Sequence, residues 1–136
     1  FMIPQVTAAA LVAENRSLAF PASVDSIPTS ANQEDHVSMA TGAARKARQV
    51  ASNAAGVVAI ELFAAAQGVD FHKPNKTSKI LQDVHVIVRQ DASFVDQDRY
   101  FADEIAALQN KVLSGDACRS RLLAALSRQH LSLLAV

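Results

Sequence analysis

The sequence is poor in the residues on which several classes of protein depend. Its 136 residues include one cysteine, Cys118, four glycines and no tryptophan. A single cysteine excludes an intrachain disulfide, and the four glycines form neither a phosphate-binding loop nor a dinucleotide-binding fingerprint. The 13 basic and 13 acidic residues cancel, so the chain lacks the basic surface that nucleic acids and anionic membranes attract. We therefore expect neither of them as a partner.

Metal-binding and secretion signals are also missing. The four histidines are His36, His72, His85 and His130. They lie far apart in the sequence and lack the paired spacing of zinc ligands, so we expect no metal site. The chain starts without a signal-peptide pattern, which together with the cysteine count predicts the cytoplasm. It begins with Phe1 rather than an initiator methionine, which indicates a fragment or a processed product.

The first half of the sequence predicts two helices separated by a long loop. Half of all residues are apolar and many are alanine, which favours helices. Pro4 suits the first turn of a helix that continues over residues 5–18. Residues 20–33 contain two prolines and several Ser and Thr, which predicts a loop, and a second helix follows over 34–67. A loop of this length in a compact domain usually has a function.

The most apolar stretch, residues 54–66, lies in the second predicted helix. Glu61 interrupts it, and it is shorter than the roughly 20 apolar residues that a bilayer requires. A helix that is apolar on all sides must be surrounded by protein. Because 136 residues can hardly enclose it, we expect other chain segments or other subunits to cover this helix.

Shorter helices are predicted in the second half. Thr77 or Ser78 caps a helix containing residues 80–88, although the alternating valines at 84, 86 and 88 leave a short strand as the alternative. Another helix begins at Asp96 or Asp98, and a glycine at position 115 ends it.

The predicted fold is therefore all-α, with helices that further protein must cover. Gly68 is expected to end the central helix, and Asp116 to cap a last helix. We treat residues 1–136 as one helical segment. Within it, residues 1–70 hold the loop and the central helix, and residues 71–136 form peripheral C-terminal helices.

Polar residues are concentrated where the long loop meets the central helix, at positions 30–36. Ser30 and Gln33 have the spacing of a capping box, and Asn32 with Asp35 repeats it. Helix capping is the favoured interpretation from residue types alone. Capping requires only one or two such groups, however, so the others remain free to face a ligand at this junction.

Four sequence runs resemble histidine ammonia-lyases in order and spacing. These runs are residues 2–11 (MIPQVTAAAL), 14–15 (EN), 21–26 (PASVDS) and 29–39 (TSANQEDHVSM). The similarity is most specific over residues 1–50. It continues more loosely through the central helix and weakens after Gly68, and Ala40 departs from the glycine that many members have.

The resemblance implies a mainly helical homotetramer, several times longer than this chain, that converts L-histidine to trans-urocanate and ammonia. It also implies that this segment is part of a bundle of long helices in that larger, mainly helical lyase fold. Members need no added cofactor, because an Ala-Ser-Gly tripeptide of the chain forms the electrophile, a methylidene-imidazolone. The sequence contains no Ala-Ser-Gly. It therefore resembles a C-terminal part of such an enzyme, with the electrophile upstream, and we expect it to be inactive alone.

The resemblance also implies roles for three residues. Glu34 matches the active-site glutamate near the substrate imidazole, where a carboxylate accepts an N–H hydrogen bond and can assist proton movement. Met2 matches a methionine of the substrate-ring pocket, although without the resemblance a core methionine is the favoured interpretation. Gln33 supports the loop or the substrate. The expected partners are histidine, the rest of the parent chain and further subunits.

Two alternatives remain. A tyrosine or phenylalanine ammonia-lyase or an aminomutase would share the scaffold, but such relatives usually carry glutamine at the position of Glu34 and tend to carry lysine at that of Met2. A non-catalytic helical oligomerisation module is the alternative from another class.

Overall fold

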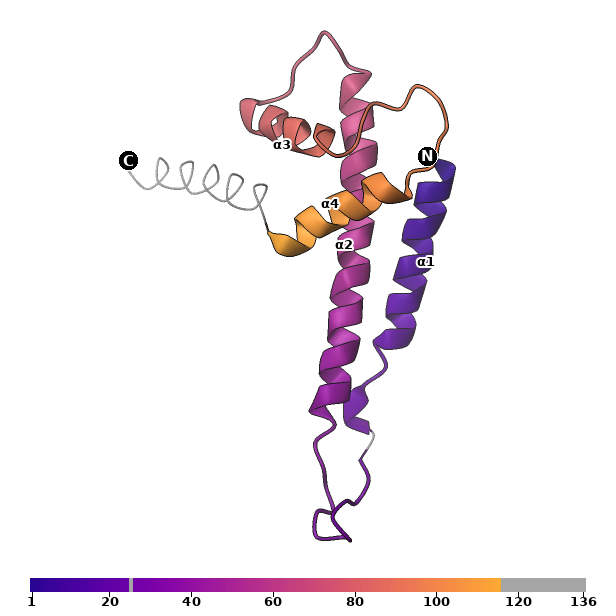
Figure 1. Ribbon diagram of the computed structural model, residues 1–136, viewed down its shortest axis with the longest axis vertical. Helices are drawn as coiled ribbons and strands as arrows, with labels where there is room; N and C mark the ends of the chain where they lie inside the picture. The colour runs from indigo at the N-terminus through magenta and orange to yellow at the C-terminus, as the bar shows by residue number, and fades with distance from the viewer. Residues whose placement is uncertain (25, 116–136) are drawn as a thin grey trace, which may run out of the picture.

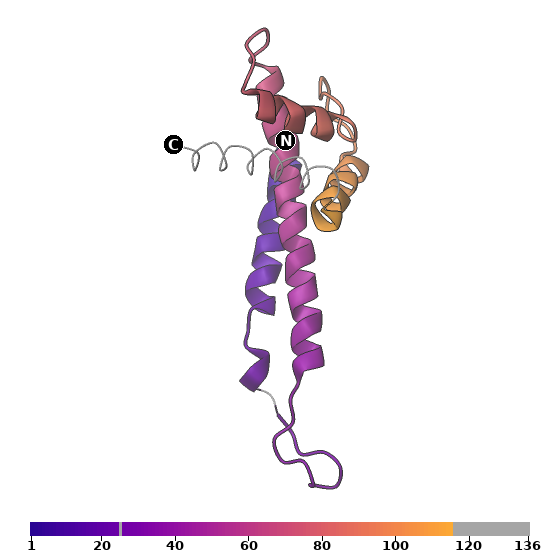
Figure 2. The ribbon, with the colours of Figure 1, turned by 90° about the vertical axis from the view of Figure 1, so that its left-hand side faces the viewer.

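The computed structural model describes residues 1–24 and 26–115, and this part of the chain is all-α, as predicted. Its elements are α1 (Met2–Leu18), a short 3-10 helix η1 (Ala22–Val24), α2 (Ala40–Asp70), α3 (Lys79–Arg89) and α4 (Ala102–Ser114). Figure 1 shows α1 lying along α2, α4 crossing α2, and α3 near the C-terminal end of α2. The connection between α1 and α2 extends beyond both helices at the opposite end of the molecule (Figures 1 and 2).

The hydrophobic core lies where α4 and the loop after α3 meet one side of α2. Its buried members are Ala59, Phe63, Ala66, Val88, Ala92, Phe101 and Leu108. Three aromatic rings close one end of this core: the ring centroids of Phe1 and Phe63 lie 5.1 Å apart, and those of Phe63 and Phe101 lie 5.6 Å apart. Such edge-to-face pairs add to the gain from burying apolar surface, so they attach the start of α1 and the start of α4 to α2.

A glycine permits the close approach of three helices. A Cβ atom on Gly56 of α2 would lie 3.0 Å from Leu11 Cδ1 of α1 and 3.6 Å from Gln109 Nε2 of α4. Gln109 Nε2 also donates a hydrogen bond to the Ser52 carbonyl oxygen at 2.9 Å. Gly56 therefore lies at the crossing point, where a Cβ atom would require the Leu11 side chain to shift.

The predicted bounds of α2 were wrong at both ends. The helix begins at Ala40 rather than near Glu34, because the residues before it form a hydrogen-bonded turn and an extended segment. It continues past Gly68, which adopts no left-handed conformation, to Asp70. Pro74 follows four residues later and cannot extend a helix.

The later helices match the prediction in type but not always in position. Ser78 Oγ accepts a hydrogen bond from the Leu81 N–H, so the predicted cap of α3 is confirmed and the strand alternative is wrong. Helix α4 starts at Ala102 rather than at Asp96 or Asp98, since the residues before it form a loop held by Arg99. Gly115 ends α4 in a left-handed conformation, with φ of 67°. The predicted last helix after Asp116 lies outside the described residues.

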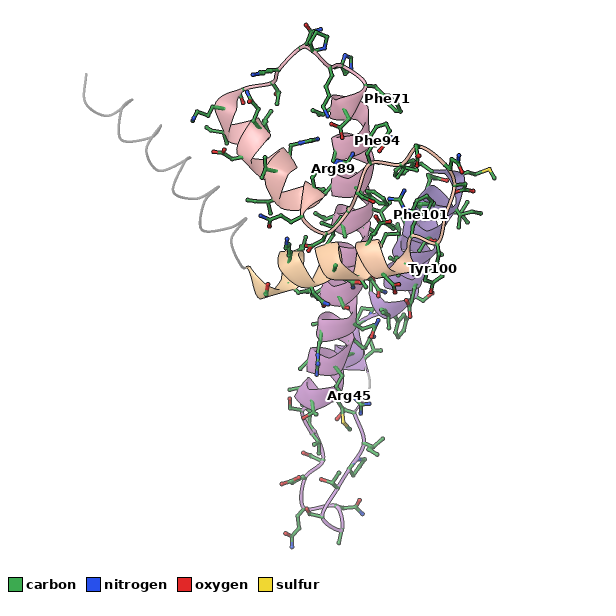
Figure 3. All side chains as sticks on the ribbon, turned by 45° about the horizontal axis from the view of Figure 1, so that its top comes forward. Arg45, Phe71, Arg89, Phe94, Tyr100 and Phe101 are labelled. Atoms are coloured by element: carbon green, nitrogen blue, oxygen red, sulfur yellow. The ribbon has the colours of Figure 1, made fainter. Side chains whose placement is uncertain are left out.

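A buried polar network joins the C-terminal end of α2 to α3 and to the loop after it. Arg89 of α3 binds Asp70 Oδ2 through Nε at 2.9 Å and Nη2 at 2.7 Å, and it reaches Gln67 Oε1 at 3.2 Å. Gln67 in turn donates to the Val95 carbonyl oxygen at 2.8 Å and accepts the Val95 N–H at 3.0 Å. Figure 3 shows Arg89 between α3 and α2.

Asp70 is the charged centre of this network. Its side chain is 4% exposed, and Lys73 Nζ and His85 Nε2 lie 2.7 and 3.3 Å from its Oδ1. Burial disfavours the carboxylate, but the hydrogen bonds from Lys73, Arg89 and His85 and the charge of Arg89 outweigh it and lower its pKa from 3.8 to about 2. Because the folded pKa is the lower one, Asp70 stabilises the fold above pH 3.8, and this contribution disappears as the pH falls toward 2.

One face of α2 and most of α1 remain uncovered. Pro4 is the only residue of α1 that is buried, and Val58 of α2 is 41% exposed. By length and composition alone α2 could also cross a membrane, a test that the core helix of a soluble protein passes as well. The stretch predicted to be apolar on all sides therefore buries one side within this chain and leaves the other open.

We predict that the isolated 136-residue chain associates or stays partly unfolded, because α1 and the open face of α2 expose apolar surface. Light scattering combined with circular dichroism tests this. A fully helical, monodisperse monomer would contradict it.

We further predict that Asp70→Asn lowers the free energy of unfolding by roughly 1–2 kcal/mol at neutral pH, because Arg89 loses its buried counter-charge. Urea unfolding at a fixed protein concentration measures the loss, which should shrink toward about pH 3. Asp83→Asn, at an exposed carboxylate on α3, is the matched control and should change nothing. A loss for Asp70→Asn that is the same at both pH values would contradict the assignment.

Candidate functional site

The connection between α1 and α2 folds into an ordered loop held by its own hydrogen bonds. Ser26 Oγ accepts the Val37 N–H at 3.0 Å and donates to the Val37 carbonyl oxygen at 3.2 Å, which ties the two arms together. Nearer the tip, Thr29 and Glu34 form an antiparallel bridge with N···O distances of 2.9 and 3.3 Å. The loop predicted from the prolines is therefore confirmed, and it has a defined geometry.

The tip of this loop holds three consecutive residues in the left-handed region. Their φ angles are 52° for Ser30, 55° for Ala31 and 67° for Asn32. Asn tolerates this conformation, but a non-glycine residue such as alanine is destabilised by about 1–2 kcal/mol in it. Backbone strain of this kind is concentrated at binding and catalytic sites, which supports a function for the loop.

The same geometry overturns the capping interpretation. Ser30 and Asn32 lie in the turn, and α2 starts only at Ala40, so neither residue caps the helix. The N-cap of α2 is Met39, without a side-chain hydrogen bond. Sequence spacing could not reveal this, because three left-handed residues in a row are rare for these residue types.

Glu34 lies at the end of the turn with its carboxylate accessible to a ligand. Its side chain is exposed, and Thr29 Oγ1 donates a hydrogen bond to its Oε2 at 2.7 Å. Gln33 precedes it and is exposed too. Thr29 was not among the predicted site residues, because a contact five positions apart follows no capping or helical spacing.

A cavity of about 340 Å³ lies beside this loop. Its lining residues come from both arms of the loop and the first turn of α2, and include Ser26, His36, Val37 and Met39. The loop therefore places polar groups next to a hollow of the size of a small ligand.

Met2 and Glu34 lie toward opposite ends of α1. Met2 begins α1 and is 76% exposed, whereas the loop with Glu34 extends beyond the other end of that helix (Figure 1). Seventeen residues of helix separate its two ends by about 24 Å, which is more than a single amino-acid substrate can span. One copy of the chain therefore does not bring these two predicted pocket residues together.

A second cavity, of about 530 Å³, lies between the end of α2 and α3 and is lined by Asp70, Lys73 and His85, among others. Within the described ranges, no three His, Cys, Asp or Glu side chains are grouped so that they could hold a metal ion. Cys118 and His130 lie outside those ranges. Phe71 and Phe94 contact one another near this end of α2, with ring centroids 5.8 Å apart (Figure 3).

Comparison with known proteins shows which family this chain belongs to. Residues 1–90 match the family model described as aromatic amino acid lyase. The chain belongs to this family. It is 63% identical over 115 residues to the histidine ammonia-lyase of Desulfotalea psychrophila and 56% identical over 127 residues to that of Burkholderia mallei.

Two solved enzyme structures contain a similar helical arrangement. The histidine ammonia-lyase of Trypanosoma cruzi superposes with a TM-score of 0.82 at 42% identity, covering 89% of this chain and 24% of that one. A tyrosine aminomutase from Streptomyces globisporus gives a TM-score of 0.76 at 37% identity, covering 91% and 23%. The helical arrangement of this chain therefore occurs in both of these enzymes.

The predicted resemblance to histidine ammonia-lyases is thus confirmed. The match to the Desulfotalea psychrophila protein covers 85% of this chain and 22% of that protein. The match to the Burkholderia mallei protein covers 93% of this chain and 24% of that protein. It therefore spans about a quarter of the length of these relatives or less.

We predict that Ala31→Gly strengthens the loop, because glycine adopts the left-handed region without steric cost. Hydrogen exchange at the Thr29 and Glu34 amides should slow about threefold to fivefold, equivalent to somewhat under 1 kcal/mol. Ala9→Gly, on an exposed face of α1, is the matched control and should destabilise its helix by about 0.5–1 kcal/mol. Faster exchange in Ala31→Gly would contradict the strained geometry.

Proposed function

We propose that this chain forms part of a histidine ammonia-lyase, which eliminates ammonia from L-histidine to give trans-urocanate. The observation that carries the proposal is the accessible, hydrogen-bonded carboxylate of Glu34 at the end of a strained loop. The identities of 56–63% to histidine ammonia-lyases support it.

The proposed role of Glu34 follows from the chemistry of the imidazole ring. An imidazole N–H requires an acceptor when it is buried, and a carboxylate is a strong one. A phenyl ring offers no donor, so a buried carboxylate facing it would stay unsatisfied. Glu34 therefore favours histidine over phenylalanine, and its free carboxylate oxygen can also hold a proton during the elimination.

Met2 and Gln33 complete the proposed substrate contacts. Met2 supplies an adaptable apolar surface for the ring, and Gln33 supports the loop or the substrate beside Glu34. Since one copy places Met2 and Glu34 toward opposite ends of α1, we propose that different copies supply them to each pocket, as in the predicted homotetramer. The open face of α2 and the exposed apolar residues of α1 support such an assembly.

The family's electrophile has no counterpart in this chain. A methylidene-imidazolone supplies the activation of the amine as leaving group, and it arises from Ala-Ser-Gly. The only Ser-Gly here, at residues 114–115, follows Leu113. Residues of this chain therefore bind and orient the substrate ring, and we propose that the 136-residue chain alone forms no urocanate.

We also propose a cytoplasmic location, and neither nucleic acid nor membrane as a partner. The balanced charge supports this, because both of those partners attract basic surfaces.

A tyrosine or phenylalanine substrate is the second candidate, favoured by the likeness to a tyrosine aminomutase. Glu34 argues against it, because such relatives usually carry glutamine at this position and the phenyl ring of phenylalanine offers no donor to a carboxylate. A non-catalytic helical module is the third candidate and predicts no turnover on any of these amino acids.

The test uses a hybrid lyase, in which this chain replaces the 115 residues that it matches in the Desulfotalea psychrophila enzyme. We predict that the hybrid lyase forms urocanate from histidine and acts poorly on tyrosine and phenylalanine. Glu34→Gln should lower histidine turnover by at least about tenfold, equivalent to roughly 1.4 kcal/mol of transition-state stabilisation.

Asp83→Asn, at an exposed carboxylate far from the loop, serves as the control and should keep full turnover. Turnover unchanged by Glu34→Gln would remove Glu34 from the site. A folded hybrid lyase without activity on any of the three amino acids would support the non-catalytic module instead.

A further inference from the structure

The hydroxyl of Thr29 contacts one oxygen of the Glu34 carboxylate and leaves the other oxygen accessible. The Thr29 Oγ1 to Glu34 Oε2 distance is 2.7 Å, which is typical of a hydroxyl bound to a charged oxygen. We propose that Thr29 is a positioning residue that orients the Glu34 carboxylate toward the substrate imidazole. This inference rests on the proposed function and adds a residue to it.

The contact depends on the turn between the two residues. Thr29 and Glu34 are paired across an antiparallel bridge by two backbone hydrogen bonds, and side chains of such a pair lie on the same face. The left-handed residues Ser30 to Asn32 reverse the chain tightly enough to make this pairing, and the Gln33 N–H closes it on the Ser30 carbonyl oxygen at 3.2 Å. The strained turn thus brings a hydroxyl to the carboxylate.

Orientation matters because a glutamate side chain has several rotatable bonds. A carboxylate offers about four lone-pair sites on its two oxygens. Thr29 engages Oε2, so Oε1 stays available for an imidazole N–H. Holding the carboxylate before the substrate arrives reduces the conformational freedom lost on binding.

Two substitutions separate the hydroxyl from the shape of the side chain. Thr29→Val keeps the branched shape but removes the O–H group, whereas Thr29→Ser keeps the O–H group. In the full-length hybrid lyase, we expect Thr29→Val to lower kcat/KM for histidine by about tenfold and Thr29→Ser to stay within about threefold of the parent. Circular dichroism and light scattering should show the same folded assembly for both variants.

A double-mutant cycle tests whether Thr29 acts through Glu34. In a Glu34→Ala background the hydroxyl has no carboxylate to orient, so adding Thr29→Val should cause no further loss. An equal loss in both backgrounds would show that Thr29 only maintains the loop and would overturn the proposal. Full activity of Thr29→Val, or a loss in Thr29→Ser as large as in Thr29→Val, would overturn it too.

The outcomes also separate this inference from the proposed function. If Glu34→Gln lowers histidine turnover but Thr29→Val does not, only the role of Thr29 fails. If Glu34→Gln leaves turnover unchanged, the role of Glu34 in the proposed site fails, and the role of Thr29 fails with it.

Discussion

The fold depends on a single long helix that the rest of the chain covers on one side only. Helix α2 spans 31 residues, and each extensive contact between the described helices includes it. Ala59 and Phe63 of α2 are fully buried, while Val58, directly before Ala59 in the sequence, is 41% exposed. This one-sided cover explains why an apolar helix forms in a short chain and why the chain requires further protein around it.

Polar contacts hold α1 against the N-terminal half of α2 and α3 against its C-terminal half. Asn53 is 3% exposed and donates to Glu14 Oε2 and Asn15 Oδ1 at 2.8 and 2.9 Å, which sets the position of α1. At the other half, Asp70 and Arg89 attach α3. Both polar atoms of the Asn53 side chain have hydrogen-bond partners. A buried polar group that is satisfied in this way specifies one arrangement, so α2 holds α1 and the adjoining loop in a defined place.

Local sequence signals predicted the features that arise from local physics. Ser78 as a cap and Gly115 as a helix end follow from backbone preferences of single residue types, and the all-α class follows from composition and apolar spacing. The start of α2 was missed because Ala31 adopts a conformation that alanine rarely takes. The Thr29–Glu34 contact was missed for the same reason, since it exists only once that turn forms. Family resemblance, rather than spacing, singled out Glu34 and Met2.

The length of α1 connects the fold to the proposed site. It separates Met2 from Glu34 within one chain, so a pocket that contains both must join two copies. Mixing two hybrid lyases, one carrying Met2→Lys and the other Glu34→Gln, tests this most directly, after each single variant is shown to be impaired. Shared pockets predict that mixed assemblies recover about a quarter of the parental activity, because random association gives that fraction of pockets both native residues. Mixed assemblies that are no more active than the two variants would contradict a pocket built from two copies.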